Sequence, residues 1–158
     1  MSLSKKLRFT FICCITACCL FALTACSSGQ SSEDKDYSSL PDTINLQIGD
    51  ATHTVTFEKN AASDSLTTLF PLYSLIIDKD GTHKQFQIPR NMELADEHID
   101  TAHAGDIFLN GPVLVEVYYA DAEINANRSR IGHIDDTTGL EEALNVKNVQ
   151  LVFDYRQA

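Results

Sequence analysis

The pair Asn110-Gly111 is the clearest fold signal in this chain. Asn-Gly between two apolar runs is a strong short-range signal for a β-hairpin, because both turn residues readily adopt positive φ. The flanking runs, 103–109 and 112–119, are rich in β-branched and aromatic residues, which favour strands. Pro112 has no N–H to donate and therefore suits the first position of a strand. Residues 113–117 are apolar except for Glu116, so we expect this strand to be covered on both faces.

Further strands are predicted on both sides of this hairpin. Thr43–Ile48 alternates apolar and polar residues, and Gly49-Asp50 provides a turn to a return strand at Thr52–Glu58. The sequence also predicts a hairpin around Asp80-Gly81, joining residues 73–77 to 83–88, and later strands at 128–134 and 149–153.

Two short helices are expected between these strands. Asn60 is a suitable N-cap for a first helix, which Pro71 would end. Thr138 and Glu141 have the spacing of a capping box for a second helix. The apolar positions are Ala62, Leu66, Leu69 and Phe70 in the first helix and Leu140 and Leu144 in the second.

The pattern fades at 89–102, where we predict a long surface loop, and residues 121–127 are predicted to form a shorter loop. There is no Gly-rich phosphate loop and no repeat of 20–50 residues. The pattern therefore predicts a mainly β fold, a closed or nearly closed antiparallel β-barrel of seven or eight strands with two short helices.

The first 25 residues have the plan of an export signal. Lys5, Lys6 and Arg8 precede an apolar run, Phe9–Ala22, that is too short to span a bilayer comfortably. The run ends in Leu23-Thr24-Ala25-Cys26, which resembles the lipobox of bacterial lipoproteins. That resemblance implies cleavage before Cys26 and attachment of a diacylglyceryl group to its thiol, and two or more acyl chains give stable anchoring.

The expected organisation is a signal peptide at 1–25, a tether at 26–42 and a folded domain at 43–158. The tether is rich in serine and acidic residues and cannot bury enough surface to order itself. We expect the mature chain at the extracytoplasmic face of the cell membrane, held by the lipid on Cys26. An ordinary secretory signal is the alternative.

The net charge and the positions of the cysteines exclude some partners and some kinds of site. The chain has 12 basic and 22 acidic residues, and removal of Lys5, Lys6 and Arg8 leaves nine basic ones and a net charge of −13. Such a surface repels phosphate backbones, so nucleic acid is not an expected partner. All five cysteines, at positions 13, 14, 18, 19 and 26, precede the folded part, which therefore has neither a disulfide nor a thiolate metal site.

Two segments carry a family resemblance. Ala104-Gly105-Asp106-Ile107 is similar to the Gly-Gly-Asp-Phe strand of cyclophilins, and Arg130–Ile134 followed by Gly139–Leu144 looks like their Phe-Gly-x-Val strand and short helix. From Ile44 to Phe153 the chain resembles the bacterial cyclophilin-like domain family. The resemblance implies an eight-stranded barrel with a helix at each end.

The isomerase site of cyclophilins is not matched. Their arginine some ten residues before the Gly-Asp pair would fall in Met92–Asp96, which has none, and Thr101–Ala104 replaces their Phe-Met-x-Gln run. We therefore expect a non-catalytic binding domain for a small molecule or peptide, without a cofactor. A divergent prolyl isomerase acting on exported proteins is the alternative, and an accessory partner of a membrane redox system is a third.

Five residues are candidates for ligand binding. Arg128 and Arg130 share one face of a strand and could bind an anionic group, although pairing with nearby acids is the simpler interpretation. Those acids are Asp121, Glu123, Asp135 and Asp136. Tyr118 and Tyr119 point to opposite faces, so one of them could line the barrel mouth, and His103 could lie at the rim.

Other chemistry is less well supported. His98 and His103 lie near Asp96, Glu97 and Asp100 without a defined zinc spacing, so a solvated acidic loop is favoured over a metal site. No nucleophile elbow is present.

Overall fold

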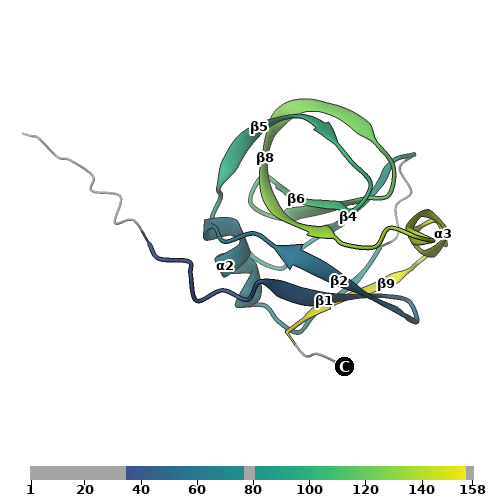
Figure 1. The fold of residues 1–158 in the computed structure, drawn as a ribbon, viewed down its shortest axis with the longest axis horizontal. Coiled ribbons are helices and arrows are strands. Elements are labelled where there is room, and N and C mark those ends of the chain that lie inside the picture. Colours follow the sequence, from purple (N-terminus) through teal and green to yellow (C-terminus); the bar gives the residue numbers. More distant parts are fainter. Residues whose placement is uncertain (1–34, 77–80, 156–158) are drawn as a thin grey trace, which may run out of the picture. The chain divides into compact units, whose positions relative to one another are not determined.

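The computed structural model describes residues 35–76 and 81–155, and in them nine strands and two helices follow one another (Figure 1). The predicted signal peptide, Cys26 and the tether as far as residue 34 lie outside the described residues. The elements are β1 (Thr43–Ile48), β2 (Ala51–Phe57), α2 (Ala61–Thr67), β3 (Leu72–Leu75), β4 (His83–Gln87), β5 (Asp96–Ala102), β6 (Asp106–Asn110), β7 (Leu114–Tyr118), β8 (Ala122–Ile134), α3 (Leu140–Leu144) and β9 (Gln150–Asp154).

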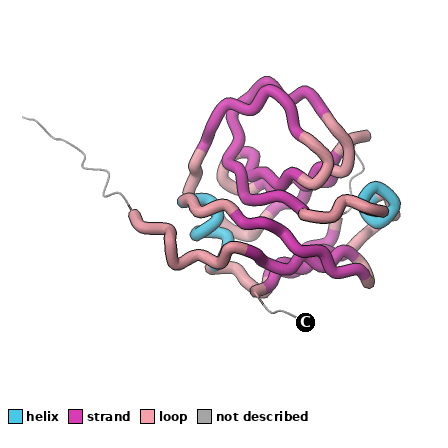
Figure 2. The backbone as a smooth tube through the Cα atoms, viewed as in Figure 1, coloured by secondary structure: helices cyan, strands magenta, loops and turns pink. Residues whose placement is uncertain are grey.

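All nine strands belong to one antiparallel, strongly curved sheet, which Figure 2 shows in magenta with the two helices beside it. Its order is β3-β9-β1-β2-β8-β6-β7-β4, and β5 pairs with β8 outside this path. The mainly β fold with two short helices is thus confirmed. The ladders recorded for the described residues leave the sheet open between β3 and β4, so the closed eight-stranded barrel is not confirmed.

Two predicted hairpins are present. β1 and β2 pair so that Ile44 lies opposite Val55. β6 and β7 pair across Asn110-Gly111, and Gly111 has a φ of +60°. The turn is longer than predicted, because Asn110 pairs with Leu114 and so places Pro112 in the loop and not in the strand.

The predicted hairpin around Asp80-Gly81 is wrong. β3 pairs with β9 and β4 pairs with β7, which places the two strands at opposite ends of the sheet path. The local turn signal was overridden because each strand finds its partner far along the chain. Residues 77–80 lie outside the described residues.

The two predicted loops contain strands. β5 occupies the second half of the 89–102 segment, and β8, which begins at Ala122, covers all of 121–127 except its first residue. β5 was missed because only Ile99 and Ala102 are buried in it, so it has no regular alternation, and its register shifts between Ile99 and Thr101. The first half of β8 does alternate, with Ala122, Ile124 and Ala126 half-buried.

Of the two predicted helix caps, one is correct and one is wrong. Asn60 caps α2, its Oδ1 accepting a bond from the N–H of Ser63 at 2.9 Å. α3 has Gly139 as its N-cap, with a φ of +73° and no side-chain cap bond, so the capping box of Thr138 and Glu141 is not formed. The N–H of Thr138 instead donates to Asp136.

The buried apolar residues form two clusters. The larger one fills the interior of the curved sheet and includes Leu46, Leu66, Ile107, Leu140 and Phe153, each fully buried. The smaller one lies on the opposite face of β6 and β7, where β5 and β8 curve over the sheet (Figure 1). Its members are Ile99, Ala102, Phe108 and Tyr118. Both tyrosines of the 118–119 pair are buried, one in each cluster.

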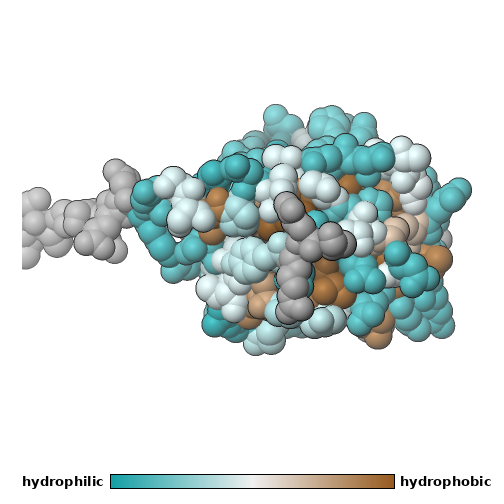
Figure 3. All heavy atoms as spheres, turned by 60° about the horizontal axis from the view of Figure 1, so that its bottom comes forward, coloured by the Kyte–Doolittle hydropathy of each residue, from teal (hydrophilic) through white to brown (hydrophobic). Residues whose placement is uncertain are grey.

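The face seen in Figure 3 is largely hydrophilic, with apolar side chains in small groups. The large apolar side chains exposed in the described residues are Tyr73, Leu75, Leu94, Val146 and Tyr155. Within the described ranges no helix has the length and apolar character that crossing a membrane requires.

Candidate functional site

Charged residues meet on the face of the sheet that carries Phe108 and Tyr118. We call Asp106, Glu116, Arg128, Arg130 and His133 the charged seam. They come from β6, β7 and β8, which are neighbours in the sheet. Register brings them together, since Phe108 of β6 lies opposite both Glu116 of β7 and Arg130 of β8.

Glu116 is the centre of one half of the seam. Its carboxylate is 3% exposed and accepts a bond from Arg128 Nε at 2.9 Å. It also accepts bonds from Asn110 Nδ2 at 2.7 Å and from the Tyr118 hydroxyl at 3.3 Å. The Tyr118 ring stacks on His83, with 4.7 Å between the ring centroids. Each carboxylate oxygen thus has a donor, which a buried charge requires.

Asp106 is the centre of the other half. It accepts bonds from Arg130 Nη1 at 3.2 Å and from the N–H of His103 at 2.9 Å, and His133 Nδ1 lies 3.0 Å from its Oδ1. Arg130 also lies 3.3 Å from Glu97 and packs over the Phe108 ring. Every contact of the seam is internal to the fold, so it ties β5 and β8 to the sheet beneath them.

The two arginines therefore do not present a free anion site. The simpler interpretation, ion pairing, is correct, but the partners are Glu116, Glu97 and Asp106 and not the four acids that the sequence offered. Those four lie in or beside the ends of β8, whereas the true partners come from β5, β6 and β7.

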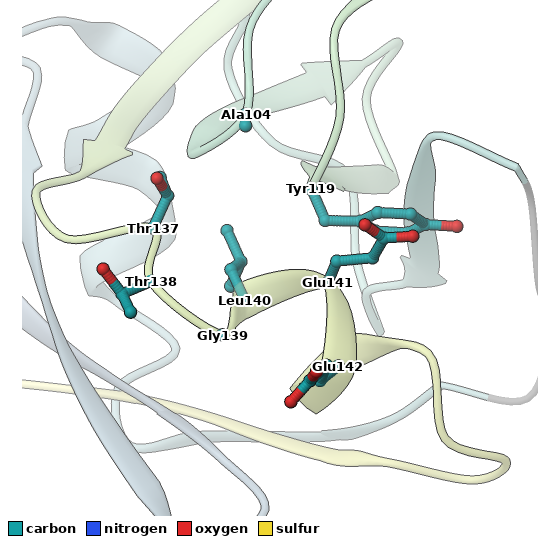
Figure 4. A pocket seen from close by; sticks show the side chains of 8 residues that line it. All are labelled: Ala104, Tyr119, Thr137, Thr138, Gly139, Leu140, Glu141 and Glu142. Carbon is teal, nitrogen blue, oxygen red and sulfur yellow. The ribbon is translucent and has the colours of Figure 1, made fainter.

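A pocket lies at the start of α3 on the far side of the 103–106 turn. Its volume is about 530 Å³. The lining residues come from three segments, the turn before β6, the end of β7 and the α3 region (Figure 4). They are Ala104, Tyr119, Thr137, Thr138, Gly139, Leu140, Glu141 and Glu142. Of the five predicted ligand-binding residues, Tyr119 alone is among them.

Glycine makes this arrangement possible. Gly105 has a φ of +99°, and a Cβ there would lie 2.8 Å from His133 Cε1 and 3.0 Å from Thr137 Cγ2. Only a residue without a side chain lets the 103–106 turn approach the β8–α3 connection so closely. The same glycine therefore joins the charged seam on one side to the pocket wall on the other.

The pocket combines hydroxyl groups and two carboxylates with Tyr119, which is only 6% exposed. Leu140 is buried beneath it, while Glu141 and Glu142 are exposed on α3. Next to the lining, the N–H and the hydroxyl of Thr138 donate to Asp136 and lower the pKa of this carboxyl below its usual value. Among the described residues, the lining offers two carboxylates and no lysine, arginine or histidine, an arrangement that favours negative potential.

The histidines lie outside the pocket lining. His103 is exposed and lies 3.4 Å from Asp121, and His98 lies 3.2 Å from Asp100. Among the described residues no group of three or more His, Cys, Asp or Glu side chains could hold a metal ion. The structure thus places a concave pocket beside a network of paired charges.

The pocket was not predicted from the sequence, which contains only a weak indication of it. In the sequence, the spacing of Thr138 and Glu141 predicts only the start of a helix. The positive φ of Gly139, which the sequence marks by a glycine beside a helix, is the feature that could have drawn attention to it.

A family model described as the cyclophilin-like family matches residues 46–154. Neither a curated protein nor a solved structure matches the chain.

Proposed function

This chain belongs to the cyclophilin-like family, and we propose that it is a lipid-anchored, extracytoplasmic binding domain that holds a small molecule or peptide without catalysing a reaction. The observation that supports binding is the pocket at α3, whose volume of about 530 Å³ is in the range of small-molecule sites. Its exposed lining side chains are the hydroxyl-bearing Thr137 and Thr138 and the carboxylates of Glu141 and Glu142.

The absence of catalysis is proposed from the sequence and from the seam. The family's isomerase arginine has no counterpart at 92–96. The arginines at 128 and 130 lie against internal carboxylates, so neither is placed to polarise a prolyl amide.

Ligand binding is tested by thermal-shift screening of the chain from Ser27 onward, which contains every described residue. The screen uses a set of short peptides and a set of small metabolites, neutral, cationic and anionic. A ligand that raises Tm and shifts the amide resonances of Thr137–Glu142 supports the proposal. A complete lack of stabilising ligands would argue against a binding domain.

The divergent prolyl isomerase remains the alternative, favoured by family membership alone. A protease-coupled proline-isomerisation assay separates the two functions. We expect no acceleration above the uncatalysed rate, and a rate that rises with protein concentration would establish the isomerase.

The anchor is proposed from the lipobox and is tested independently of the ligand. Cys26→Ser removes the thiol that would carry the lipid. We expect the wild-type chain in the membrane fraction and the variant released from it, with Cys19→Ser as a matched control that stays in the membrane. Unchanged membrane association of Cys26→Ser would overturn the anchor.

A further inference from the structure

Asn110-Gly111, where β6 ends and the turn to β7 begins, has the features of a site that modifies itself. Asn110 is the only asparagine in the chain that a glycine follows. Gly111 has no side chain to hinder the approach of its backbone nitrogen to the Asn110 side-chain carbonyl, and a Cβ built on it would meet nothing within 4 Å. Its N–H has no hydrogen-bond partner among the described residues. This nitrogen is therefore free to react once a solvent base removes its proton.

The other reacting group, the Asn110 amide, contacts the charged seam. Its Nδ2 donates to Glu116 Oε1 at 2.7 Å. The Glu116 side chain is 3% exposed, and its second oxygen, Oε2, accepts from Arg128 Nε at 2.9 Å. Within the described residues Oε1 accepts no bond besides the one from Asn110. Any chemical change of this amide therefore acts directly on a buried charge.

We propose that Asn110 is a site of spontaneous deamidation and that its conversion weakens the charged seam. The deprotonated Gly111 nitrogen attacks the side-chain carbonyl carbon of Asn110 and forms a cyclic succinimide. The side-chain nitrogen takes up a proton from water and leaves as ammonia. Water then opens the ring at either carbonyl, which gives aspartate or isoaspartate. The overall reaction consumes water and releases ammonia, and it needs no oxidant and no bound ligand.

Deamidation reverses the role of residue 110 in this contact. The amide donates to Glu116, whereas the carboxylate that replaces it can only accept. Two like charges would then face each other where 2.7 Å now separates a donor from an acceptor, and Arg128 would have to compensate both. Isoaspartate also lengthens the backbone by a carbon at the residue that pairs with Leu114. Both products should loosen the contact between β7 and β8.

Peptide mapping by mass spectrometry tests the reaction on the chain from Ser27 onward, incubated at mildly alkaline pH. We expect the peptide with Asn110 to gain the mass difference between an amide and a carboxyl group, and isoaspartate to be detected in it. Asn125 is the internal control, because it is exposed and precedes Ala126. Gly111→Ala should slow the conversion at least about tenfold, since a Cβ hinders the approach of the nitrogen. An Asn110 that converts no faster than Asn125, or as fast in Gly111→Ala, would overturn the site.

Thermal unfolding of three variants tests the effect on the seam. Asn110→Asp, which imitates one product, should lower Tm. Asn125→Asp adds the same charge at an exposed position and should leave Tm nearly unchanged. The double variant Asn110→Asp with Glu116→Gln again places an amide opposite a carboxylate, so it should recover most of the loss.

If Asn110→Asp does not fold, the deamidated fraction of the incubated wild type, isolated by ion exchange, takes its place in the comparison. Equal Tm values for the product and for Asn125→Asp would overturn the link between Asn110 and the seam. A double variant no more stable than Asn110→Asp would overturn the link as well, because the repulsion between two carboxylates would then not be the cause.

Discussion

Arg128 Nε lies 2.9 Å from the Glu116 carboxylate, and the two side chains are only 16% and 3% exposed. This pair joins β7 to β8, two strands that lie on either side of β6 in the sheet. Removing one partner of such a pair leaves the other charge buried and without its counterion.

We expect Arg128→Met to destabilise the fold by about 3 kcal/mol, because Glu116 would keep its charge in a poorly solvated place. Urea unfolding of the two single variants and the double variant measures this. Glu116→Gln with Arg128→Met should cost clearly less than the sum of the single changes, because no charge remains unpaired. Strict additivity would show that the pair does not couple.

We expect Gly105→Ala to cost about 3 kcal/mol or more, since an L-residue is strained at positive φ and its Cβ also meets neighbours. The Cβ would lie 2.8 Å from His133 Cε1 and 2.9 Å from the Ile134 carbonyl oxygen. Gly49→Ala is the control, because Gly49 also has positive φ but nothing within 4 Å. It should cost about 1 kcal/mol, the backbone part alone. If thermal unfolding shows equal losses of stability for Gly105→Ala and Gly49→Ala, the steric argument is contradicted.

We expect Asn60→Ala to cost about 1–2 kcal/mol, because it removes two bonds. Asn60 caps α2 through Oδ1 and donates from Nδ2 to the Arg130 carbonyl oxygen at 2.8 Å. Asn60→Asp keeps the cap and removes the second bond, so its loss should be smaller. Thr138→Ala, at the cap that is not formed, should stay within about 0.5 kcal/mol of wild type. Guanidinium unfolding measures the free energy of unfolding of each variant. A larger loss of stability for Thr138→Ala than for Asn60→Ala would reverse the assignment of the caps.

We expect the Asp136 carboxyl to titrate below 3.8, because the N–H of Thr138 and then its hydroxyl donate to the charged form and lower the pKa. A depressed pKa in the folded state stabilises the fold above pH 3.8, and this contribution is lost as the pH falls through the folded value. Carbon NMR titration measures the midpoint. Thr138→Val removes the hydroxyl and keeps the N–H, so the midpoint should rise only part of the way. A wild-type midpoint at or above 3.8 would contradict the assigned bonds.

Local chemistry made part of this fold predictable. Asn110-Gly111 and Gly49-Asp50 each join two strands that pair, because turn residues and short apolar runs act within a few residues of one another. Asn60 caps its helix for the same reason. The family resemblance, which rested on Gly105-Asp106 and on the segment after Arg130, is confirmed by the match over residues 46–154.

The predictions that failed depended on partners far along the chain. Residues 73–77 and 83–88 have strand character, yet β3 and β4 pair with β9 and β7 and not with each other. β5 is a strand because β8 offers it a ladder, although its own composition is that of a polar loop. The environment outweighed the local preference in both cases.

Outside β5 and the first half of β8, the sequence by itself determined the strand character, together with two hairpins, the first helix cap and the family. Only the tertiary structure decided which carboxylates neutralise Arg128 and Arg130 and which residues surround Tyr119. The physical reason is that a turn is governed by the backbone preferences of adjacent residues, whereas an ion pair or a pocket depends on which strands become neighbours. Which strands become neighbours depends on burying apolar surface over the whole domain, so it cannot be deduced from any single segment.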